Sequence, residues 1–524
     1  MTTGSIDVWQ TQPAVAELPG VAKRIPPAAV VGVIATGISW AASWIPSFWG
    51  DEAASVMSAE RPIPSLIAEL GRIDAVHGLY YLFLHGWIGA FGASELSVRL
   101  PSAIAVGIAA AGVVTLASRF AGLRVAVLAG LVFSVLPRVT AMGDEARSYA
   151  MQAAVAVWLM VWFLHLLRGR DTRPRAWLAY GVVLGLSAYL FLYLLLLTAV
   201  QVAAVLLAAR GTRPQRAGTR RLVVAASSVA VIVALPILVI ADRQKEQIAF
   251  LARRDYATAY SVLVDQWFGW VPLAVLCWLL VGCALAATFL CRRRPASAAA
   301  STRRDGVVLA LAWLVLPTAL LLLLNGFVTP LYNVRYLSFV TPAVAILIAI
   351  GLAAVPELLG RVSSRPLRAA TLAAELLVIV AVVAAPAYLM QRTPFAKDGG
   401  SDWREVATAV RAEARPGDPI VFDQATKPSQ RPRLAMRLYP QDFAAVRDVA
   451  LATPFARRAG LWDAVHPVSA LGHELAGVQR VLAVELRTTA QPADIRSLRR
   501  DGFQVTDVDH LHRTDLYTLT REQS

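Results

Sequence analysis

The chain has 524 residues, of which 57% are hydrophobic and only 16% are charged. Soluble domains carry about 25% charged residues, so this composition excludes an ordinary soluble enzyme and indicates that lipid surrounds much of the chain. The net charge of +15 does not indicate nucleic-acid binding, because the arginines cluster in short gaps between apolar runs and form no basic stripe with interleaved aromatic residues.

The chain starts with a mixed segment, residues 1–26, which ends in Lys23-Arg24. The apolar run that follows is longer than most signal-peptide cores, so we expect an uncleaved first helix behind a cytoplasmic tail. The apolar block 176–209 is too long for one span and is divided near Tyr189. The apolar runs together predict eleven transmembrane helices, at 27–48, 98–118, 125–143, 149–167, 176–190, 191–209, 221–241, 270–291, 306–327, 336–355 and 368–390.

The segment 79–92 is apolar but short for a span, and it contains His85 and three glycines. We interpret it as a helix that lies in the membrane surface, so that 49–97 becomes one large external loop. With this choice the predicted cytoplasmic loops hold 21 basic residues, against ten in the external loops. The positive-inside rule then predicts a multi-pass plasma (inner) membrane protein with a cytoplasmic N-terminus and an extracytoplasmic C-terminus.

The composition changes after the predicted transmembrane domain, 27–392, because residues 393–524 are polar and contain no span. Asp402 and Glu405 resemble a capping box for a helix that runs to about Arg415. Further strands are predicted at 419–422, 480–486 and 503–508. We therefore expect a small extracytoplasmic α/β domain, which supports acceptor binding or stability without chemistry of its own.

The three cysteines, Cys277, Cys283 and Cys291, all lie in or at the end of one apolar run. Disulfides and metal sites need cysteines at suitable spacing, and these offer neither a CxxC pair nor a histidine partner. We interpret them as packing residues.

Asp51 and Glu52 follow the first predicted helix, after Trp49-Gly50. Charge at a membrane boundary is costly and usually functional. A carboxylate at the dry edge of a site has reduced hydration, so its basicity can rise, which suits a general base that accepts a proton from a hydroxyl. The alternative is a pair of solvated acids that cap residues 53–59.

A second polar segment, 144–150, has the sequence DEARSYA and lies at the outer end of the third predicted span. On a helix, Glu145 and Tyr149 share a face, whereas Arg147 diverges from Glu145. Arg138 lies about two turns earlier, within reach of the same end of the span. The alternative is that these residues are interfacial anchors.

A third segment, 330–337, has the sequence PLYNVRYL. Arg335 could hold a phosphate group at the lipid boundary, or it could extend from the helix to the membrane surface as a snorkelling residue. The external loop 242–269 is interpreted as an amphipathic lid or a solvated connector. The spans contain almost no acids apart from Glu375, which argues against a secondary transporter.

The order of these segments resembles that of the GT-C membrane glycosyltransferases, in particular the branch of the protein O-mannosyltransferases and aminoarabinose transferases (family 39/83-like). The resemblance covers residues 27 to about 420, and it departs from the family pattern at Gly78-Leu79, where the family often has two prolines. The matching elements are Asp51-Glu52, His77 to Tyr81, the FGxSExxxRLPS segment 91–102, Glu145 with Arg147 and Tyr149, Arg335-Tyr336-Leu337, and Asp402-Trp403-Arg404.

This resemblance implies a GT-C-like α-helical polytopic fold and an inverting transfer of a sugar from a polyprenyl-phosphate donor. It implies Asp51 as the catalytic base and Glu145 as a catalytic residue that positions the acceptor or the donor sugar. Four residues would hold the phosphate, namely His77, Arg138, Arg147 and Arg335, and further substrate contacts are assigned to Glu52, Asp74, Tyr80, Tyr149 and Tyr336.

The acceptor implied is a hydroxyl of a cell-envelope glycan, lipid or protein. Mannose or a pentose such as arabinose is favoured as the sugar, since the Ala-, Arg- and Val-rich composition suits a high-GC bacterium such as an actinobacterium. No metal ligand is assigned, and a divalent cation stays an open option. The alternatives are a non-enzymatic glycan-binding, lipid-carrier-binding or assembly protein and, as the weakest class, a transporter.

Overall fold

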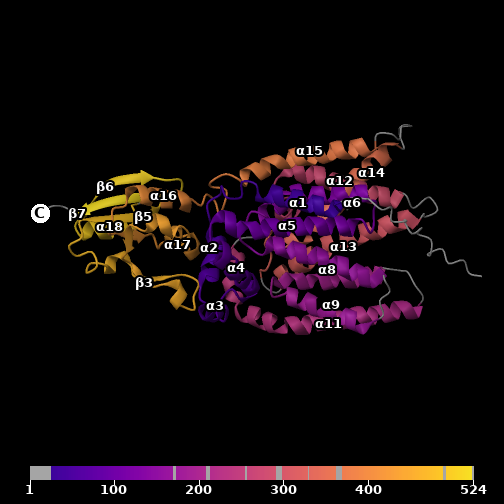
Figure 1. Cartoon of the computed structure of the whole chain (residues 1–524), viewed down its shortest axis with the longest axis horizontal. Coiled ribbons are helices and arrows are strands. Elements are labelled where there is room, and N and C mark those ends of the chain that lie inside the picture. Colours follow the sequence, from indigo (N-terminus) through magenta and orange to yellow (C-terminus); the bar gives the residue numbers. More distant parts are fainter. Residues whose placement is uncertain are drawn as a thin grey trace, which may run out of the picture.

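The computed structural model describes residues 25–168, 173–207, 213–253, 256–290, 298–327, 330–360, 369–487 and 491–521. A long helical bundle makes up most of the molecule, and a smaller α/β domain lies at one end of it (Figure 1). The bundle contains the helices α1 (Pro27–Trp40), α5 (Glu95–Ala117), α6 (Leu123–Val135), α7 (Pro137–Met142), α8 (Tyr149–Arg168), α9 (Pro174–Ser187), α10 (Leu197–Leu207), α11 (Arg213–Arg243), α12 (Val271–Leu290), α13 (Ala298–Phe327), α14 (Thr341–Gly360) and α15 (Ala369–Met390).

Each of the eleven predicted runs contains a helix of this bundle. Seven helices of the described chain are long and apolar enough to cross a membrane, and shorter apolar helices lie at Pro27–Trp40, Leu123–Val135 and Leu192–Leu206. The predicted break in 176–209 is confirmed, because α9 ends at Ser187 and the backbone is extended at Phe191 before α10 begins. The fold class is therefore that of a polytopic helical membrane protein, while the number of crossings stays a prediction.

Small residues allow the central helices to approach closely, as is common between membrane helices. A Cβ atom at Gly32 of α1 would lie 2.9 Å from the carbonyl oxygen of Gly107 in α5. A Cβ at Gly351 of α14 would lie 2.0 Å from the carbonyl oxygen of Leu280 in α12. Most of α14 is buried. A helix that other helices surround is apolar on all sides, and this explains the uniformly apolar sequence of α14.

Four short helical elements follow α1 and lie between the bundle and the α/β domain (Figure 1). The segment predicted as a surface helix forms α4, whose 14 residues are fewer than a span requires. It packs on α2 and α5 and leaves Leu79, Leu82 and Phe83 exposed, so its place in the membrane surface stays a prediction. The four elements are α2 (Gly50–Glu60), α3 (Ile63–Leu70), η1 (Ala75–His77) and α4 (Gly78–Phe91).

The described residues at the edges of the predicted cytoplasmic segments lie at the end of the bundle away from the α/β domain. There the Arg168 guanidinium lies 4.6 Å from the centre of the Phe120 ring, and Arg303 pairs with Glu357 at 2.8 Å. Helix α5 starts at Glu95, which is bonded to the α/β domain, and runs for 23 residues towards Phe120. That length is about 34 Å, so the two predicted faces lie at opposite ends of the bundle.

The predicted orientation can be tested with reporter fusions. Fusions after residues 170, 215 and 300 should report a cytoplasmic location, because the basic loops keep these ends inside. Fusions after residues 260 and 400 should report an external location. Paired alkaline phosphatase and green fluorescent protein fusions make this measurement, and an external signal at 215 would contradict the arrangement.

The α/β domain contains a five-stranded sheet with the strand order β2-β1-β5-β7-β6. Strand β1 is parallel to β2 and β5, whereas β7 is antiparallel to both β5 and β6. The three predicted strands correspond to β1, β5 and β6, whereas β2 and β7 were not predicted. The bounds are β1 (Asp418–Phe422), β2 (Val446–Asp448), β5 (Arg480–Leu486), β6 (Phe503–His510) and β7 (Thr514–Arg521), with a separate β3 (Leu451–Thr453) and β4 (Ala464–Val465) pair and the helices α16 (Trp403–Glu413), α17 (Arg433–Leu438) and α18 (Ala493–Arg500).

The predicted helix at residue 402 is present as α16, but the predicted capping box is wrong. No side chain caps its first turn. The Asp402 carboxylate instead accepts hydrogen bonds from the backbone N–H groups of Arg513 and Thr514, and Glu405 accepts one from the N–H of His512. The two carboxylates therefore anchor the β6–β7 turn to α16, a contact that a local pattern cannot reveal.

Several predictions lie wholly or partly outside the described residues. The predicted cytoplasmic tail is not described before residue 25, and Cys291 is also in an undescribed segment. Cys277 is buried within α12, which fits a packing role, and Cys283 is partly exposed.

Candidate active site

Asp51 and Arg335 form an ion pair at the end of the bundle that carries the α/β domain. Arg335 Nη1 donates to Asp51 Oδ2 at 3.0 Å, although the two residues lie 284 positions apart in sequence. The side chains are 32% and 26% exposed, respectively, so both can meet a substrate. The Arg335 guanidinium also lies 4.8 Å from the centre of the Trp49 ring, a cation–π contact that fixes its position.

Arg147 joins Asp51 to the His77 segment. Its Nη1 donates to the backbone carbonyl of Asp51 at 3.4 Å and to the hydroxyl groups of Ser55 and Tyr81. Its Nη2 lies 3.1 Å from His77 Nε2. The first turn of α2 and the loop before α4 are therefore bound by one guanidinium.

His77 is neutral in this arrangement. Burial and the positive charge of Arg147 both hold the pKa of His77 well below its usual value of 6.5. Because an arginine can only donate, His77 Nε2 accepts from Arg147 and the ring proton is on Nδ1. We predicted that His77 would help to hold a phosphate; it can do so as a hydrogen-bond donor, while the positive charge comes from the arginines.

The loop that carries His77 is held by side chains from the 242–269 region. Gln247 accepts a hydrogen bond from the N–H of Asp74 at 3.0 Å, and Gln244 accepts one from the N–H of Ala75 at 3.0 Å. The Asp74 carboxylate accepts from the Tyr81 hydroxyl at 2.9 Å, and burial raises the pKa of Asp74. This part of the 242–269 region therefore supports the site and is not only a solvated connector.

Glu52 lies behind the site, where it forms a buried ion pair with Arg99. The Arg99 Nε and Nη2 atoms donate to the two Glu52 oxygens at 2.7 and 2.6 Å, and both side chains are 0% exposed. Glu52 Oε1 also accepts from the N–H of Ala146 at 2.9 Å. We predicted Glu52 as a substrate contact, but a substrate could reach this carboxylate only if the ion pair opened. Its geometry is that of a support that joins α2, α5 and the 144–148 segment.

The segment between α7 and α8 is a series of turns and bends, so the helical spacing predicted for Glu145 and Tyr149 is wrong; α8 begins only at Tyr149. Lys397 Nζ donates to the carbonyl of Asp144 at 2.8 Å and lies 3.7 Å from Glu145 Oε1. Asp144 also pairs with Arg392 at 3.2 Å.

Aromatic side chains border the Asp51–Arg335 pair. The Tyr149 ring centre lies 5.9 Å from the Arg335 guanidinium and 6.3 Å from the centre of the Phe191 ring. The Tyr336 ring packs against those of Phe191 and Tyr193 at 5.8 and 5.7 Å. These rings give the site an apolar wall on the side of the bundle.

Two further predicted residues are mainly enclosed by the protein. The Arg138 guanidinium donates to the carbonyls of Gln266 and Asp265, both at 2.9 Å, so it anchors α7 to the segment before α12. Tyr80 is 1% exposed, and its ring packs against that of Tyr81.

Lys397 and Arg392 are site residues that the sequence patterns did not predict. Both follow the last predicted span on the predicted external face, where the positive-inside rule disfavours basic residues. Such an exception needs an explanation, and their ion pairs with the 144–145 acids provide one. This signal could have identified them.

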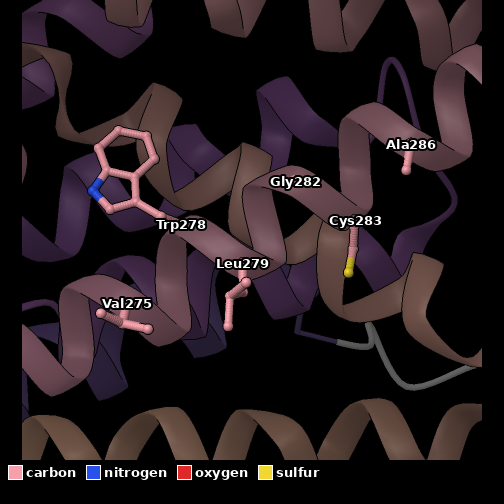
Figure 2. Close-up of a pocket in the computed structure, with 6 residues that line it drawn as sticks. All are labelled: Val275, Trp278, Leu279, Gly282, Cys283 and Ala286. Atoms are coloured by element: carbon pink, nitrogen blue, oxygen red, sulfur yellow. The ribbon is translucent and has the colours of Figure 1, made fainter.

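A groove of about 550 Å³ runs along α12, away from these residues (Figure 2). It is lined by Val275, Trp278, Leu279, Gly282, Cys283 and Ala286, which offer no charged group for catalysis. Within the described chain, no group of three His, Cys, Asp or Glu residues is placed to hold a metal ion.

The helical bundle, with acids and arginines at the end that carries the α/β domain, has a GT-C fold like that of ArnT. The structure is similar to that of ArnT from Cupriavidus metallidurans in the apo state, with a TM-score of 0.54 and 16% sequence identity. The match covers 93% of this chain and 97% of the ArnT chain. ArnT from the same organism bound to undecaprenyl phosphate matches with 15% identity, the same coverages and the same TM-score.

Residues 79–240 match the family model described as Dolichyl-phosphate-mannose-protein mannosyltransferase. No curated protein matches the chain by sequence. The fold and the family match together support a membrane glycosyltransferase, and they agree with the resemblance found in the sequence.

Proposed function

We propose that this protein is an inverting glycosyltransferase that uses a polyprenyl-phosphate sugar as its donor and a hydroxyl of a cell-envelope acceptor. Mannose and arabinose are the favoured sugars. The observation that carries the proposal is the Asp51–Arg335 pair, a partly exposed carboxylate beside a partly exposed guanidinium. The structural relative that binds undecaprenyl phosphate supports a lipid-phosphate donor.

The proposed reaction needs one base and one group of cations. Asp51 accepts the proton of the acceptor hydroxyl while the hydroxyl oxygen attacks the anomeric carbon of the donor. The new glycosidic bond forms as the bond between that carbon and the phosphate oxygen breaks. The bonding electrons leave with the polyprenyl phosphate, and attack from the opposite face inverts the anomeric centre.

The leaving phosphate gains negative charge, and fixed positive groups stabilise such a charge in the transition state. Arg335 and Arg147 are the cations nearest to Asp51. His77 Nδ1–H can add a hydrogen bond without adding charge. Arginine suits this task because its planar guanidinium binds phosphate oxygens in pairs.

The ion pair also links donor binding to the proposed base. A donor phosphate competes with Asp51 for the guanidinium of Arg335. When Arg335 turns to the phosphate, the Asp51 carboxylate is free to accept a hydrogen bond from the acceptor hydroxyl, so activation of the acceptor follows donor binding.

The proposal is tested with purified protein in nanodiscs and two donors, polyprenyl-phosphate mannose and polyprenyl-phosphate arabinose. Transfer to a membrane-extract acceptor should release polyprenyl phosphate, and proton NMR of the product should show the anomer opposite to that of the donor. Release of polyprenyl phosphate with retention of the anomeric configuration would contradict the inverting mechanism. Failure of both donors would contradict the assigned sugars.

A carrier-binding or assembly protein is the second candidate, favoured by the extensive contacts of the α/β domain with α2 and α3, which lie between it and the bundle. Arg61 alone donates to the carbonyls of Arg458 and Gly460 at 2.7 Å. Such a protein would bind undecaprenyl phosphate without turnover, and substitution of Asp51 would leave its cellular role intact.

A further inference from the structure

The connector between α15 and the α/β domain runs beside the segment that leads to Asp51. The N–H of Ser47 donates to the carbonyl of Pro394 at 2.9 Å, and the Ser401 hydroxyl donates to the carbonyl of Phe48 at 2.6 Å. A Cβ atom at Gly50 would lie 2.3 Å from the carbonyl oxygen of Ser429. The α/β domain therefore abuts the very turn of α2 that presents the proposed base.

Asp398, in this connector, has an unusual backbone conformation. Its φ is +48°, and Gly399 and Gly400 follow with φ values of +66° and +102°. The left-handed region is unfavourable for a residue with a side chain, although Asp tolerates it better than most. The backbone at Asp398 is therefore strained, and this conformation sets the direction of its carboxylate.

Two contacts from the α/β domain fix Asp398. Gln430 Nε2 donates to its Oδ2 and Oδ1 at 3.2 and 3.3 Å, and Arg513 Nη1 donates to its carbonyl at 3.1 Å. The residue remains partly exposed. A carboxylate offers about four lone-pair positions, so the Gln430 amide leaves acceptor capacity for a ligand.

Asp398 also lies close to the proposed catalytic pair. Gln430, which holds its carboxylate, follows Ser429, whose carbonyl oxygen lies against Gly50, the residue before Asp51. Burial raises the pKa of Asp398, and the charges of Asp51 and Arg335 act on it in opposite directions. A ligand bonded to Asp398 would therefore be close to the base.

We propose that Asp398, held by Gln430, is a specificity-determining residue that binds neighbouring hydroxyl groups of a sugar in the acceptor. The inference rests on the proposed function, and it assigns the acceptor as a glycan. Vicinal hydroxyls are paired donors, which a charged carboxylate binds strongly. The fold then assigns the two binding roles to different parts of the protein. The bundle supplies the cations that bind the lipid phosphate, and the connector with the α/β domain binds the acceptor.

Two substitutions distinguish the role of the Asp398 carboxylate from that of its backbone conformation. Asp398→Asn keeps the side-chain shape and a residue that tolerates the left-handed conformation, but it removes the charge and one acceptor oxygen. Asp398→Gly keeps the backbone freedom and removes the side chain. Each should weaken acceptor binding by about 10- to 100-fold, the range for loss of a hydrogen bond to a charged group.

The experiment uses the full chain in nanodiscs, with mannotriose and arabinotriose as probes in saturation-transfer NMR. The wild-type protein should bind at least one trisaccharide, and both Asp398 variants should lose that binding. The affinity for undecaprenyl phosphate, measured on the same samples, should be unchanged, because its proposed ligands lie in the bundle.

Three results would overturn the inference. They are unchanged trisaccharide binding in the variants, no binding of either trisaccharide by the wild type, and a parallel loss of undecaprenyl phosphate binding, which would indicate a structural role. The proposed function is judged separately, since trisaccharide binding does not need a sugar transfer to occur. A wild type that binds a trisaccharide but transfers neither sugar would contradict the proposed function and leave Asp398 as a glycan-binding residue.

Discussion

Replacing Asp51 with asparagine should lower the rate of sugar transfer on the order of 10³-fold, in the middle of the range for loss of a general base. Asparagine has nearly the same shape, and its side-chain oxygen can still accept a hydrogen bond from Arg335. It cannot accept the proton of the acceptor hydroxyl at neutral pH. The loss should therefore appear in kcat, while the protein remains folded.

The structure provides a matched control for this substitution. Asp242 lies near the same end of the bundle, in the last turn of α11, and its side chain is 75% exposed. Among the described residues its ion-pair partner is Lys245, three positions further along the chain. Asp242→Asn should leave the transfer rate within about twofold of the wild type, since exposed ion pairs contribute little. The two variants are compared by steady-state transfer assays in nanodiscs.

A transfer rate for Asp51→Asn close to that of the wild type would show that Asp51 is not the base. Loss of undecaprenyl phosphate binding together with the rate would instead assign Asp51 to donor binding. The opposite result is expected for the lipid. Asparagine holds Arg335 more weakly than aspartate does, so phosphate competes better for this guanidinium and the affinity for undecaprenyl phosphate should rise.

The second large effect is expected at Arg99. Arg99→Met should lower the free energy of unfolding by about 3–5 kcal/mol, because it leaves the Glu52 carboxylate charged and buried without its partner. The guanidinium also donates to the carbonyls of Ser43, Pro46 and Ser47. These bonds order the chain just before the turn that carries Asp51, so activity should fall together with stability.

Two further variants separate charge burial from a general loss of packing. Glu52→Gln combined with Arg99→Met should recover part of the lost stability, because it removes the uncompensated charge. Arg303→Met affects a pair whose side chains are 24% and 48% exposed, and it should cost no more than about 1 kcal/mol. Unfolding in mixed micelles, followed by tryptophan fluorescence, makes the comparison; equal losses at Arg99 and Arg303 would contradict the assigned role of the buried pair.

The long apolar runs predicted the helices, because the length and hydropathy of a run are read directly from the local sequence. The same holds for the break near Tyr189 and for strands β1, β5 and β6. Local patterns failed where a distant partner decides. Asp402 and Glu405 have the spacing of a capping box, but the β6–β7 turn offers them other donors. Glu145 and Tyr149 have helical spacing, but the chain bends between them because Lys397 and the Glu52–Arg99 pair hold its polar groups.

The sequence by itself determined that this is a polytopic membrane protein, that its acids and several arginines lie on one predicted face, and that their order resembles the GT-C glycosyltransferases. Only the tertiary structure decided which of these residues meet. Asp51 pairs with Arg335, Glu52 turns inward to pair with Arg99, and Asp398 in the connector is bonded to Gln430 of the α/β domain. The physical reason is that contacts between residues hundreds of positions apart depend on how the helices pack, and no local spacing records that packing.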